Sequence, residues 1–310
     1  MPSTDPGRHR PVMVEEVLEY LACGPGQVVA DLTVGSGGHA AAILERIRPE
    51  GWLIGIDRDP EAIERARRRL ARLGRVTLIH EDYADLEVIL DELGVDAVDG
   101  VLIDCGASLE QLTTARRGFS FRLDGPLDMR MDPRQTTTAA ELVNRLPEGE
   151  LARILREYGG ERRARKIAKA IAATRQQQPI TTTAQLAATI TEAIPPRARP
   201  RRLHAATKSF MALRIAVNDE LGSLRKALAA AMRRTRIGGR IVVLTYHSLE
   251  GGETKGAFRL ARDRSRCPPF PSGEVPRIRL LTKKVVKPSA DECRENPSAR
   301  SATLRAAERL

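Results

Sequence analysis

The sequence is poor in several features that mark particular classes of protein. Its four cysteines are Cys23, Cys105, Cys267 and Cys293. None of them forms a C-x-x-C pair, so a zinc site and a disulfide framework are both poorly supported. No apolar run approaches the length of a membrane span, and the first residues, MPSTDPGRHRPVMV, lack the apolar segment of a secretory signal. We therefore expect a cytoplasmic protein without a metal site.

Aromatic residues are also scarce, whereas positive charge is in surplus. Aromatics make up 3% of the chain, which argues against a platform that stacks many bases. There are 51 Lys and Arg residues against 40 Asp and Glu, a formal net charge of +11. Much of the surplus lies in Arg65–Arg75, Arg153–Arg175 and the run PPRARPRR at Pro195–Arg202. Since no helix face explains the Pro-rich run, a polyanion such as nucleic acid is the natural partner.

Strand and helix patterns alternate over the first hundred residues. The predicted strands are Gln27–Val34, Trp52–Ile56, Val76–Ile79 and Val98–Ile103, and the predicted helices are Gly38–Ile47, Pro60–Leu73 and Asp85–Leu93. Short connections between such elements imply right-handed crossovers and a parallel sheet. Ligands of such a sheet bind beyond the carboxyl ends of its strands.

The pattern changes after about residue 111. Helices are predicted at Glu148–Gln177, Thr182–Ile194 and Thr207–Arg236, and strands return at Arg240–Thr245 and, more weakly, at Arg277–Leu281 and Ala302–Ala306. We therefore predict an α/β core formed by residues 1–111 and 204–310. A mainly helical insertion over residues 112–203 interrupts it.

The stretch DLTVGSGGHAAAIL, residues 31–44, is apolar before its glycines and helix-forming after them. Its Gly35, Gly37 and Ala40 satisfy the G-x-G-x-x-G/A spacing of a dinucleotide-binding loop. That spacing alone fits a nicotinamide cofactor as well as other nucleotides.

Four acids lie at or just after the predicted strand ends: Asp31, Asp57, Asp82 and Asp104. Like charges around one cleft raise each other's pKa, and they would repel a pyrophosphate. They suit S-adenosylmethionine, which carries a sulfonium, an ammonium and a ribose diol that needs an acidic acceptor. Asp57, about twenty residues past the glycines, has the usual place for that acceptor. These features favour a methyl donor, with a nicotinamide cofactor as the alternative.

The segment GFSFRLDGPLDMRMDP, Gly118–Pro133, is irregular and holds two of the five phenylalanines within three residues. One interpretation is a packed surface loop anchored by Phe119 and Phe121. The other is a loop beside the ligand cleft that offers an aromatic face, Asp128 and Arg130 to a base and its phosphate. The residue types leave both interpretations open.

Motifs along nearly the whole chain, from His9 to Glu308, resemble the ribosomal RNA small-subunit methyltransferase H family, the cytosine-N4 methyltransferases of bacteria. They include DLTVGSGGHA, GIDRDPEAI, VDGVLIDCGAS, RGFSFRLDGPLDMRMD, YGGERRARKIAKAI and GGRIVVLTYHSLE. The resemblance implies a Rossmann-like, class I S-adenosylmethionine-dependent methyltransferase whose helical insertion recognises the substrate. That substrate would be the exocyclic N4 of a cytidine in the decoding region of small-subunit ribosomal RNA.

The resemblance also implies site residues. Carried over by motif, the donor pocket comprises Gly37, Gly38, His39, Asp57, Tyr83, Asp104 and Gln111. The first three would hold the methionine end of the donor, Asp57 its ribose, and Tyr83 would flank its adenine. The family emphasises Tyr83 rather than the neighbouring Asp82. Asp128 and His247 are the candidate acceptors for a proton of the cytosine amino group.

Several positions depart from the family pattern: Leu109, Ala205, Lys208, Gly251, Gly252 and Ser298. They bear on the RNA side or on loop rigidity, and the two glycines predict a looser helix start. A non-catalytic donor- and RNA-binding assembly factor is therefore a second hypothesis, and a nicotinamide-dependent oxidoreductase is a third. The implied partners are small-subunit ribosomal RNA or the 30S particle, with no membrane, and a homodimer is left open.

Two basic clusters fall in or beside the insertion. Arg162, Arg163, Arg165 and Lys166 follow a predicted helix break at Gly159–Gly160, and Arg199, Arg201 and Arg202 belong to the Pro-rich run. We expect both clusters to contact RNA phosphates while the strand-end loops receive one extruded cytosine. A solvated helix face is the alternative for the first cluster.

Overall fold

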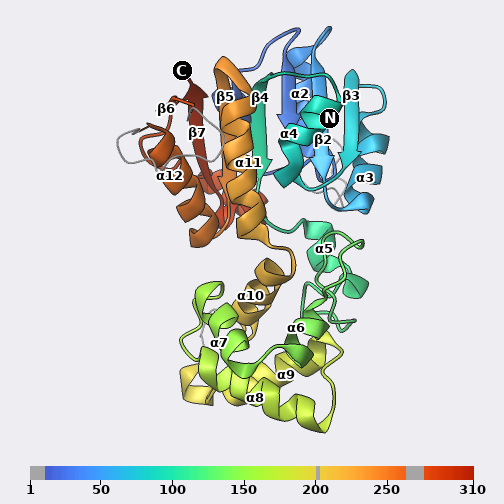
Figure 1. Cartoon of the computed structure of the whole chain (residues 1–310), viewed down its shortest axis with the longest axis vertical. Helices are drawn as coiled ribbons and strands as arrows, with labels where there is room; N and C mark the ends of the chain where they lie inside the picture. The colour runs from blue at the N-terminus through green and yellow to red at the C-terminus, as the bar shows by residue number, and fades with distance from the viewer. Residues whose placement is uncertain (1–10, 200–202, 263–275) are drawn as a thin grey trace. The chain divides into compact units, whose positions relative to one another are not determined.

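The computed structural model describes residues 11–199, 203–262 and 276–310. They form two compact units (Figure 1): a core unit, Met1–Gly106 with Leu221–Leu310, and a helical unit, Ala107–Glu220. The boundaries therefore differ from those predicted at 111/112 and 203/204. The physical reason at the second boundary is helix α10 (Thr207–Val217), whose Phe210 and Leu213 are buried in the hydrophobic cluster of the helical unit.

The core unit contains a seven-stranded sheet in the order β3-β2-β1-β4-β5-β7-β6 (Figure 1). Its strands are β1 (Val28–Asp31), β2 (Trp52–Asp57), β3 (Arg75–His80), β4 (Val98–Asp104), β5 (Thr235–Thr245), β6 (Ile278–Leu280) and β7 (Thr303–Arg309). Strands β1 to β5 pair in parallel, which confirms the predicted parallel sheet. Strand β7 pairs antiparallel with both β5 and β6.

Helices cover both faces of this sheet. They are α1 (Val14–Leu21), α2 (Gly38–Ile47), α3 (Pro60–Leu70), α4 (Leu86–Glu92), α11 (Glu220–Arg234), α12 (Ser248–Arg262) and α13 (Ala290–Glu295). Successive residues of a strand point to opposite faces, so Leu53 joins the cluster with α1, α2 and α3 while Ile54 joins the cluster with α4, α11 and α12. This is the doubly wound, Rossmann-like arrangement that the sequence predicted.

The helical unit is built around one hydrophobic cluster. Its helices are α5 (Leu109–Thr113), α6 (Ala139–Arg145), α7 (Glu148–Glu157), α8 (Ala164–Gln177), α9 (Thr183–Ala193) and α10. The helix predicted over Glu148–Gln177 is therefore two helices, α7 and α8, and the break predicted at Gly159–Gly160 is confirmed. A Cβ at Gly159 would lie 2.7 Å from the carbonyl oxygens of Leu155 and Lys208, so only glycine fits that approach.

The helix predicted over Thr207–Arg236 is also two helices, α10 and α11. The break follows Asn218, whose side-chain oxygen accepts from the Met131 amide at 2.7 Å and whose amide group donates to Met129 O at 2.8 Å. The next residue, Asp219, takes a left-handed φ of 43°. Contacts with a loop 87 residues away in the sequence therefore end α10, which local helix propensity could not reveal.

The segment Gly118–Pro133 is a packed loop. Phe119 is buried, and the buried Arg117 donates through its guanidinium to the carbonyls of Arg130 and Met131. Phe121 stacks on His204 with ring centroids 4.4 Å apart and meets Phe210 edge-on. Of the two interpretations, these contacts bear out the packing role of Phe119 and Phe121, and the role of the loop toward a base and its phosphate stays a prediction.

Helix α12 generates a stability prediction, because Gly252 lies inside it with open space where a Cβ would be. Gly252→Ala should raise the free energy of unfolding by about 1 kcal/mol, since alanine loses less backbone entropy in a helix. Urea denaturation measures the change. Gly118→Ala is the opposed control: with φ of 70° and a Cβ only 2.2 Å from Pro126 O, it should destabilise the protein. An unchanged or lower stability of Gly252→Ala would contradict the prediction.

Candidate active site

Three acids end three adjacent parallel strands of the core unit. Asp31, Asp57 and Asp104 are the last residues of β1, β2 and β4. Asp31 lies in register with Gly55 of β2 and Leu102 of β4, so the three carboxylates share one edge of the sheet. The order of strands reverses between β1 and β4, which is the position where α/β sheets of this type bind ligands.

Asp57 joins the loops that follow β1 and β2. Its Oδ2 accepts from the Gly35 amide and its Oδ1 from the Asp59 amide, both at 2.9 Å. Burial raises the pKa of Asp57 to about 6, although these two hydrogen bonds favour its ionised form. Each carboxylate oxygen has a second lone pair, so the side chain can still accept two ligand hydroxyls.

The glycine loop leads directly into α2. Gly35 and Gly37 take positive φ angles of 53° and 77°, and Gly37 is the N-cap of the helix. Within the described residues no side chain caps this N-terminus. A Cβ at Gly38 would lie 2.9 Å from Pro11 Cγ, so the first turn also needs glycine there. The first amides of α2 are consequently a suitable site for an anionic group.

His39 and Asp104 lie close together at this edge. His39 is buried; its Nε2 donates to Val12 O at 2.8 Å, and its Nδ1 lies 3.7 Å from Asp104 Oδ2. The Tyr246 hydroxyl donates to Asp104 Oδ1 at 2.8 Å, and burial followed by the nearby Asp104 raises the pKa of Tyr246. Tyr246 was not among the site residues predicted from the sequence, and its place beside His247 in GGRIVVLTYHSLE was the only signal.

Asp31 is the most deeply buried of the strand-end acids. It is 1% exposed, and its Oδ1 accepts from the Thr33 amide at 3.2 Å. No hydrogen-bond partner for Oδ2 is found in the part of the chain that the structure describes. Burial, together with the charges of Asp104 and Asp57, raises the pKa of Asp31 to about 7, although the hydrogen bond from the Thr33 amide favours the ionised form. A cation bound at this edge would stabilise the ionised form of Asp31, which burial disfavours.

The fourth acid, Asp82, has a structural role. It caps the 3₁₀ turn Tyr83–Asp85 through the Ala84 amide, 2.8 Å from Oδ1, and it accepts from the Ser223 hydroxyl at 3.1 Å. The neighbouring Tyr83 lies beneath the guanidinium of Arg58, which is 4.8 Å from the ring centroid. The role of Tyr83 beside the adenine stays a prediction.

Gln111 and Asp128 belong to the helical unit. Gln111 is buried and forms a reciprocal capping box with Ser108 at the start of α5. Asp128 is held by Arg130, whose Nε and terminal nitrogen each donate at 2.8 Å. Burial would raise the pKa of Asp128, but the hydrogen bonds from Arg130 outweigh it and hold that pKa below its usual value. The donor role of Gln111 and the acceptor role of Asp128 stay predictions.

His247 follows β5 in the core unit. Its Nε2 lies 2.9 Å from Oε1 of the buried Glu250, and Glu250 Oε2 accepts from the Tyr246 amide at 2.8 Å. The imidazole is therefore held against an acid at the start of α12. The role of His247 as an acceptor is also still a prediction.

None of the described helices is both long and apolar enough to cross a membrane. Residues 7–310 match the model of the MraW methylase family. A Geobacter sulfurreducens protein named ribosomal RNA small subunit methyltransferase H is 53% identical, covering 97% of this chain and 99% of that protein.

Relatives with the same name occur in other organisms. The protein from Syntrophotalea carbinolica is 50% identical, covering 98% of each chain. The protein from Heliobacterium modesticaldum is 47% identical, covering 97% of this chain and 98% of its own. With a family match over nearly the whole chain and relatives at this level of identity, the chain belongs to the MraW methylase family.

Proposed function

We propose that this methyltransferase transfers the methyl group of S-adenosylmethionine to the exocyclic N4 of a cytidine in the decoding region of small-subunit ribosomal RNA, in the cytoplasm. The observation that carries the proposal is the buried carboxylate of Asp31, one oxygen of which has no hydrogen-bond partner among the described residues. It lies at the same sheet edge as the start of α2, which no described side chain caps. Together they offer an acid and a set of amides to a ligand that has both an ammonium and a carboxylate.

The residues of this edge fit the donor. Asp31 and Asp104 would face its cationic groups, the first amides of α2 its carboxylate, and Asp57 its ribose hydroxyls. Tyr83 offers an aromatic face for the adenine. When bound, S-adenosylmethionine supplies a methyl group on a positively charged sulfur. A pyrophosphate, by contrast, would meet three carboxylates, so the geometry does not favour the nicotinamide alternative.

Methyl transfer to the cytosine amino group does not require a strong general base. The amino nitrogen of cytosine is a poor nucleophile because its lone pair is delocalised into the ring. The protein must hold this nitrogen in line with the methyl group and accept an N–H hydrogen bond as the nitrogen pyramidalises. Positioning can supply up to about 7–11 kcal/mol of the barrier. Asp128, which its lowered pKa keeps ionised at neutral pH, is suited to accept a hydrogen bond.

No observation favours the non-catalytic alternative. Leu109 is exposed on a helix, α5, that forms and is capped, and Gly251 and Gly252 lie within the continuous helix α12. Lys208 still reaches the carbonyl of Gly160 at 3.1 Å. None of the departures replaces a residue proposed to contact the donor.

A transfer assay tests the proposed function directly. The protein is incubated with labelled S-adenosylmethionine and 30S particles from a strain that lacks the activity, and nucleosides are identified by mass spectrometry. The expected product is N4-methylcytidine in the decoding region. Protein-free ribosomal RNA in a parallel reaction distinguishes RNA from the particle as substrate, and sedimentation of the protein tests for a homodimer. Donor binding without transfer to either substrate would favour the assembly factor.

Asp31→Asn generates a pH-dependent prediction. The variant should bind S-adenosylmethionine at least about tenfold more weakly at pH 8, the equivalent of one hydrogen bond to a charged group. Because the pKa of Asp31 is about 7, wild-type affinity should rise as the pH rises through 7, and the variant should lose that rise. Calorimetry measures both. The control is Asp82→Asn, because the carboxylate of Asp82 caps the turn Tyr83–Asp85, and this variant should keep the wild-type affinity. Equal affinities of wild type and Asp31→Asn would refute the role.

The same side chain affects stability with the opposite pH dependence. Asp31 binds its proton more tightly in the folded protein, where its pKa is about 7, than in the unfolded chain, where it is 3.8. The ligand-free protein should therefore lose stability as the pH rises from about 4 to about 7. Asp31→Asn should remove this part of the loss, which denaturation at pH 5 and pH 8 can detect.

Asp128→Asn should lower kcat about a hundredfold, at the lower end of what one positioned proton acceptor contributes. The chain offers a matched control in the same loop. Asp132 is paired with Arg134 by a similar side-chain geometry, with Arg134 Nε 2.9 Å from Oδ2, and Asp132→Asn should leave kcat within a few-fold of wild type. His247→Ala tests the other candidate. Rates close to wild type for Asp128→Asn and His247→Ala would remove both residues from the acceptor role.

A further inference from the structure

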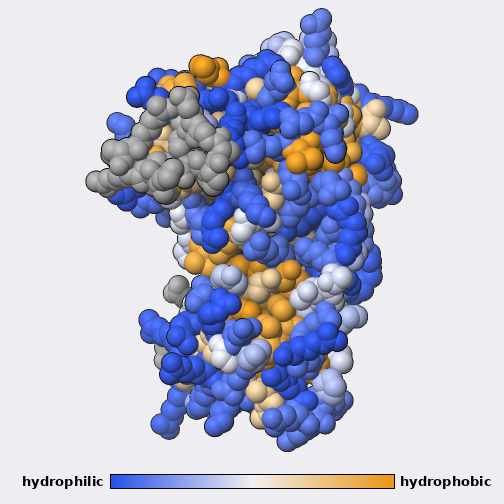
Figure 2. Space-filling view, viewed as in Figure 1, coloured by the Kyte–Doolittle hydropathy of each residue, from blue (hydrophilic) through white to orange (hydrophobic). Residues whose placement is uncertain are grey.

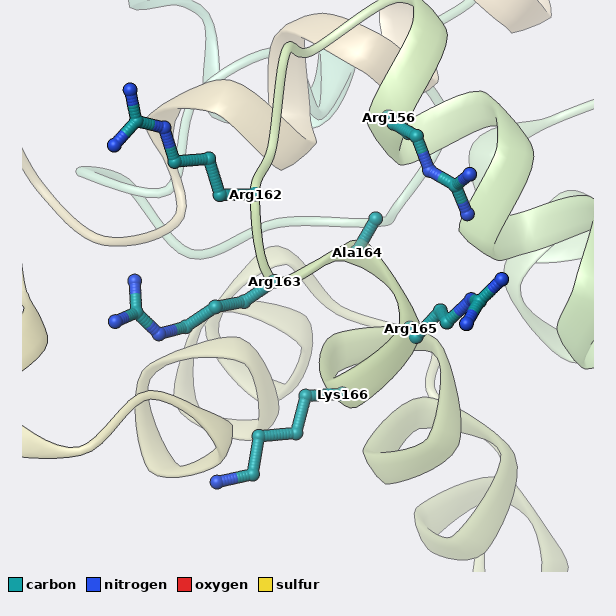
Figure 3. A pocket seen from close by; sticks show the side chains of 6 residues that line it. All are labelled: Arg156, Arg162, Arg163, Ala164, Arg165 and Lys166. Atoms are coloured by element: carbon teal, nitrogen blue, oxygen red, sulfur yellow. The ribbon is translucent and has the colours of Figure 1, made fainter.

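A pocket of about 420 Å³ opens where α7 ends and α8 begins, within the helical unit (Figure 3). Six residues line it: Arg156, Arg162, Arg163, Ala164, Arg165 and Lys166. Five of the six are cationic, and four of these five are exposed while Arg163 is half-buried. Arg156 comes from α7, so the pocket adds a residue that the cluster seen in the sequence did not include.

The acids nearest in sequence do not neutralise these cations. Glu157 pairs with Arg153 at 3.0 Å, on the surface of α7. Glu161 is buried, and its Oε1 accepts from the backbone amide of Arg163 at 2.9 Å. Among residues 11–199, 203–262 and 276–310, no ion pair is found for any of the five pocket cations. By contrast, Arg130 and Arg214 of the same unit each have a carboxylate partner.

The backbone that carries the pocket is fixed by tertiary contacts. Gly160 takes a φ of +57°, and its carbonyl accepts from the Lys208 ammonium of α10 at 3.1 Å. Gly159 approaches the backbone of α10 so closely that no side chain fits. Ala164 and Ile167 anchor the first turn of α8 in the hydrophobic cluster. The cations therefore project from a preformed frame rather than from an adaptable loop.

The side chains do not converge on one point. In Figure 3, Arg162, Arg163 and Lys166 extend to one side of the α7–α8 connection, and Arg156 and Arg165 lie on the other. Hydrophilic side chains also dominate the visible surface of α7 and α8 in Figure 2. A single phosphate could satisfy only some of these charges, whereas a chain of phosphates could contact both sides.

We propose that this pocket binds the phosphate backbone of the RNA substrate at several successive phosphates. Guanidinium groups suit this role because they donate to phosphate oxygens in pairs. Such contacts supply affinity and position the RNA, and they do not select the base. The inference rests on the proposed function, since it assigns to the helical unit the binding of the RNA whose cytidine is methylated.

The second basic cluster has one described member, Arg199, whose side chain is already hydrogen-bonded. The Arg199 side chain donates to the carbonyls of Thr191 and Ile194, at 3.0 and 3.1 Å, and so satisfies the end of α9. Arg201 and Arg202 lie outside the described residues. The α7–α8 pocket is therefore the site to test first.

The test compares two triple variants with the same loss of charge. Arg162→Gln/Arg163→Gln/Lys166→Gln removes three pocket cations, and Arg67→Gln/Arg68→Gln/Arg72→Gln removes three from the exposed surface of α3 and the residues after it. Each is assayed for binding to an RNA fragment of the decoding region across a salt series, and for S-adenosylmethionine affinity. The pocket variant should bind RNA more weakly, and its salt slope should be shallower by up to about 0.7 per lost contact with a single strand.

The pocket variant should also raise KM for RNA while kcat and donor affinity stay near wild type, and the control variant should match wild type throughout. An unchanged salt slope, or an equal loss in both variants, would overturn the inference. These results are separate from failure of the proposed function. In that case the wild-type protein itself would transfer no methyl group to cytidine, whatever its affinity for RNA.

Discussion

One carboxylate connects the two loops at the carboxyl edge of the sheet, where we propose that the methyl donor binds. Asp57 accepts the amide of Gly35 after β1 and the amide of Asp59 after β2, so a single side chain sets the spacing of both loops. It can do so because β1 and β2 are neighbouring parallel strands in register. Asp57 thus holds the start of the loop that leads to Gly37, the N-cap of α2.

The two units carry opposite charge where their ligands would bind. The core unit gathers Asp31, Asp57 and Asp104 at one edge, where burial raises the pKa of the first two to about 7 and about 6. The helical unit instead places five cations around the α7–α8 pocket. Each arrangement is unfavourable alone because like charges repel. At the sites that we propose, a cationic methyl donor would relieve the repulsion among the acids and a polyanionic RNA the repulsion among the cations, so the two ligands would not compete for one site.

The positions that depart from the family pattern are accommodated by local structure. Lys208 reaches the carbonyl of Gly160 and so supports the frame of the basic pocket. Ser298 donates its backbone amide to Asn296 Oδ1 at the start of a 3₁₀ turn. Gly251 and Gly252 leave α12 continuous, although each costs helix stability relative to alanine. None of these positions belongs to the set of acids, Asp31, Asp57 and Asp104, that end the strands β1, β2 and β4.

The sequence alone determined the alternation of strands and helices, the glycine loop and the strand-end acids, because periodicity and turn residues are local signals. Only the tertiary structure decided which polar groups meet. Tyr246 reaches Asp104 across 142 positions, and Asn218 ends α10 by binding a loop 87 residues away. Arg156 of α7 lines the basic pocket together with residues that follow the break at Gly159–Gly160. Within the described residues Asp31 Oδ2 has no hydrogen-bond partner, and this depends on the packing around it. Contacts of this kind arise from three-dimensional packing, and no local pattern encodes them.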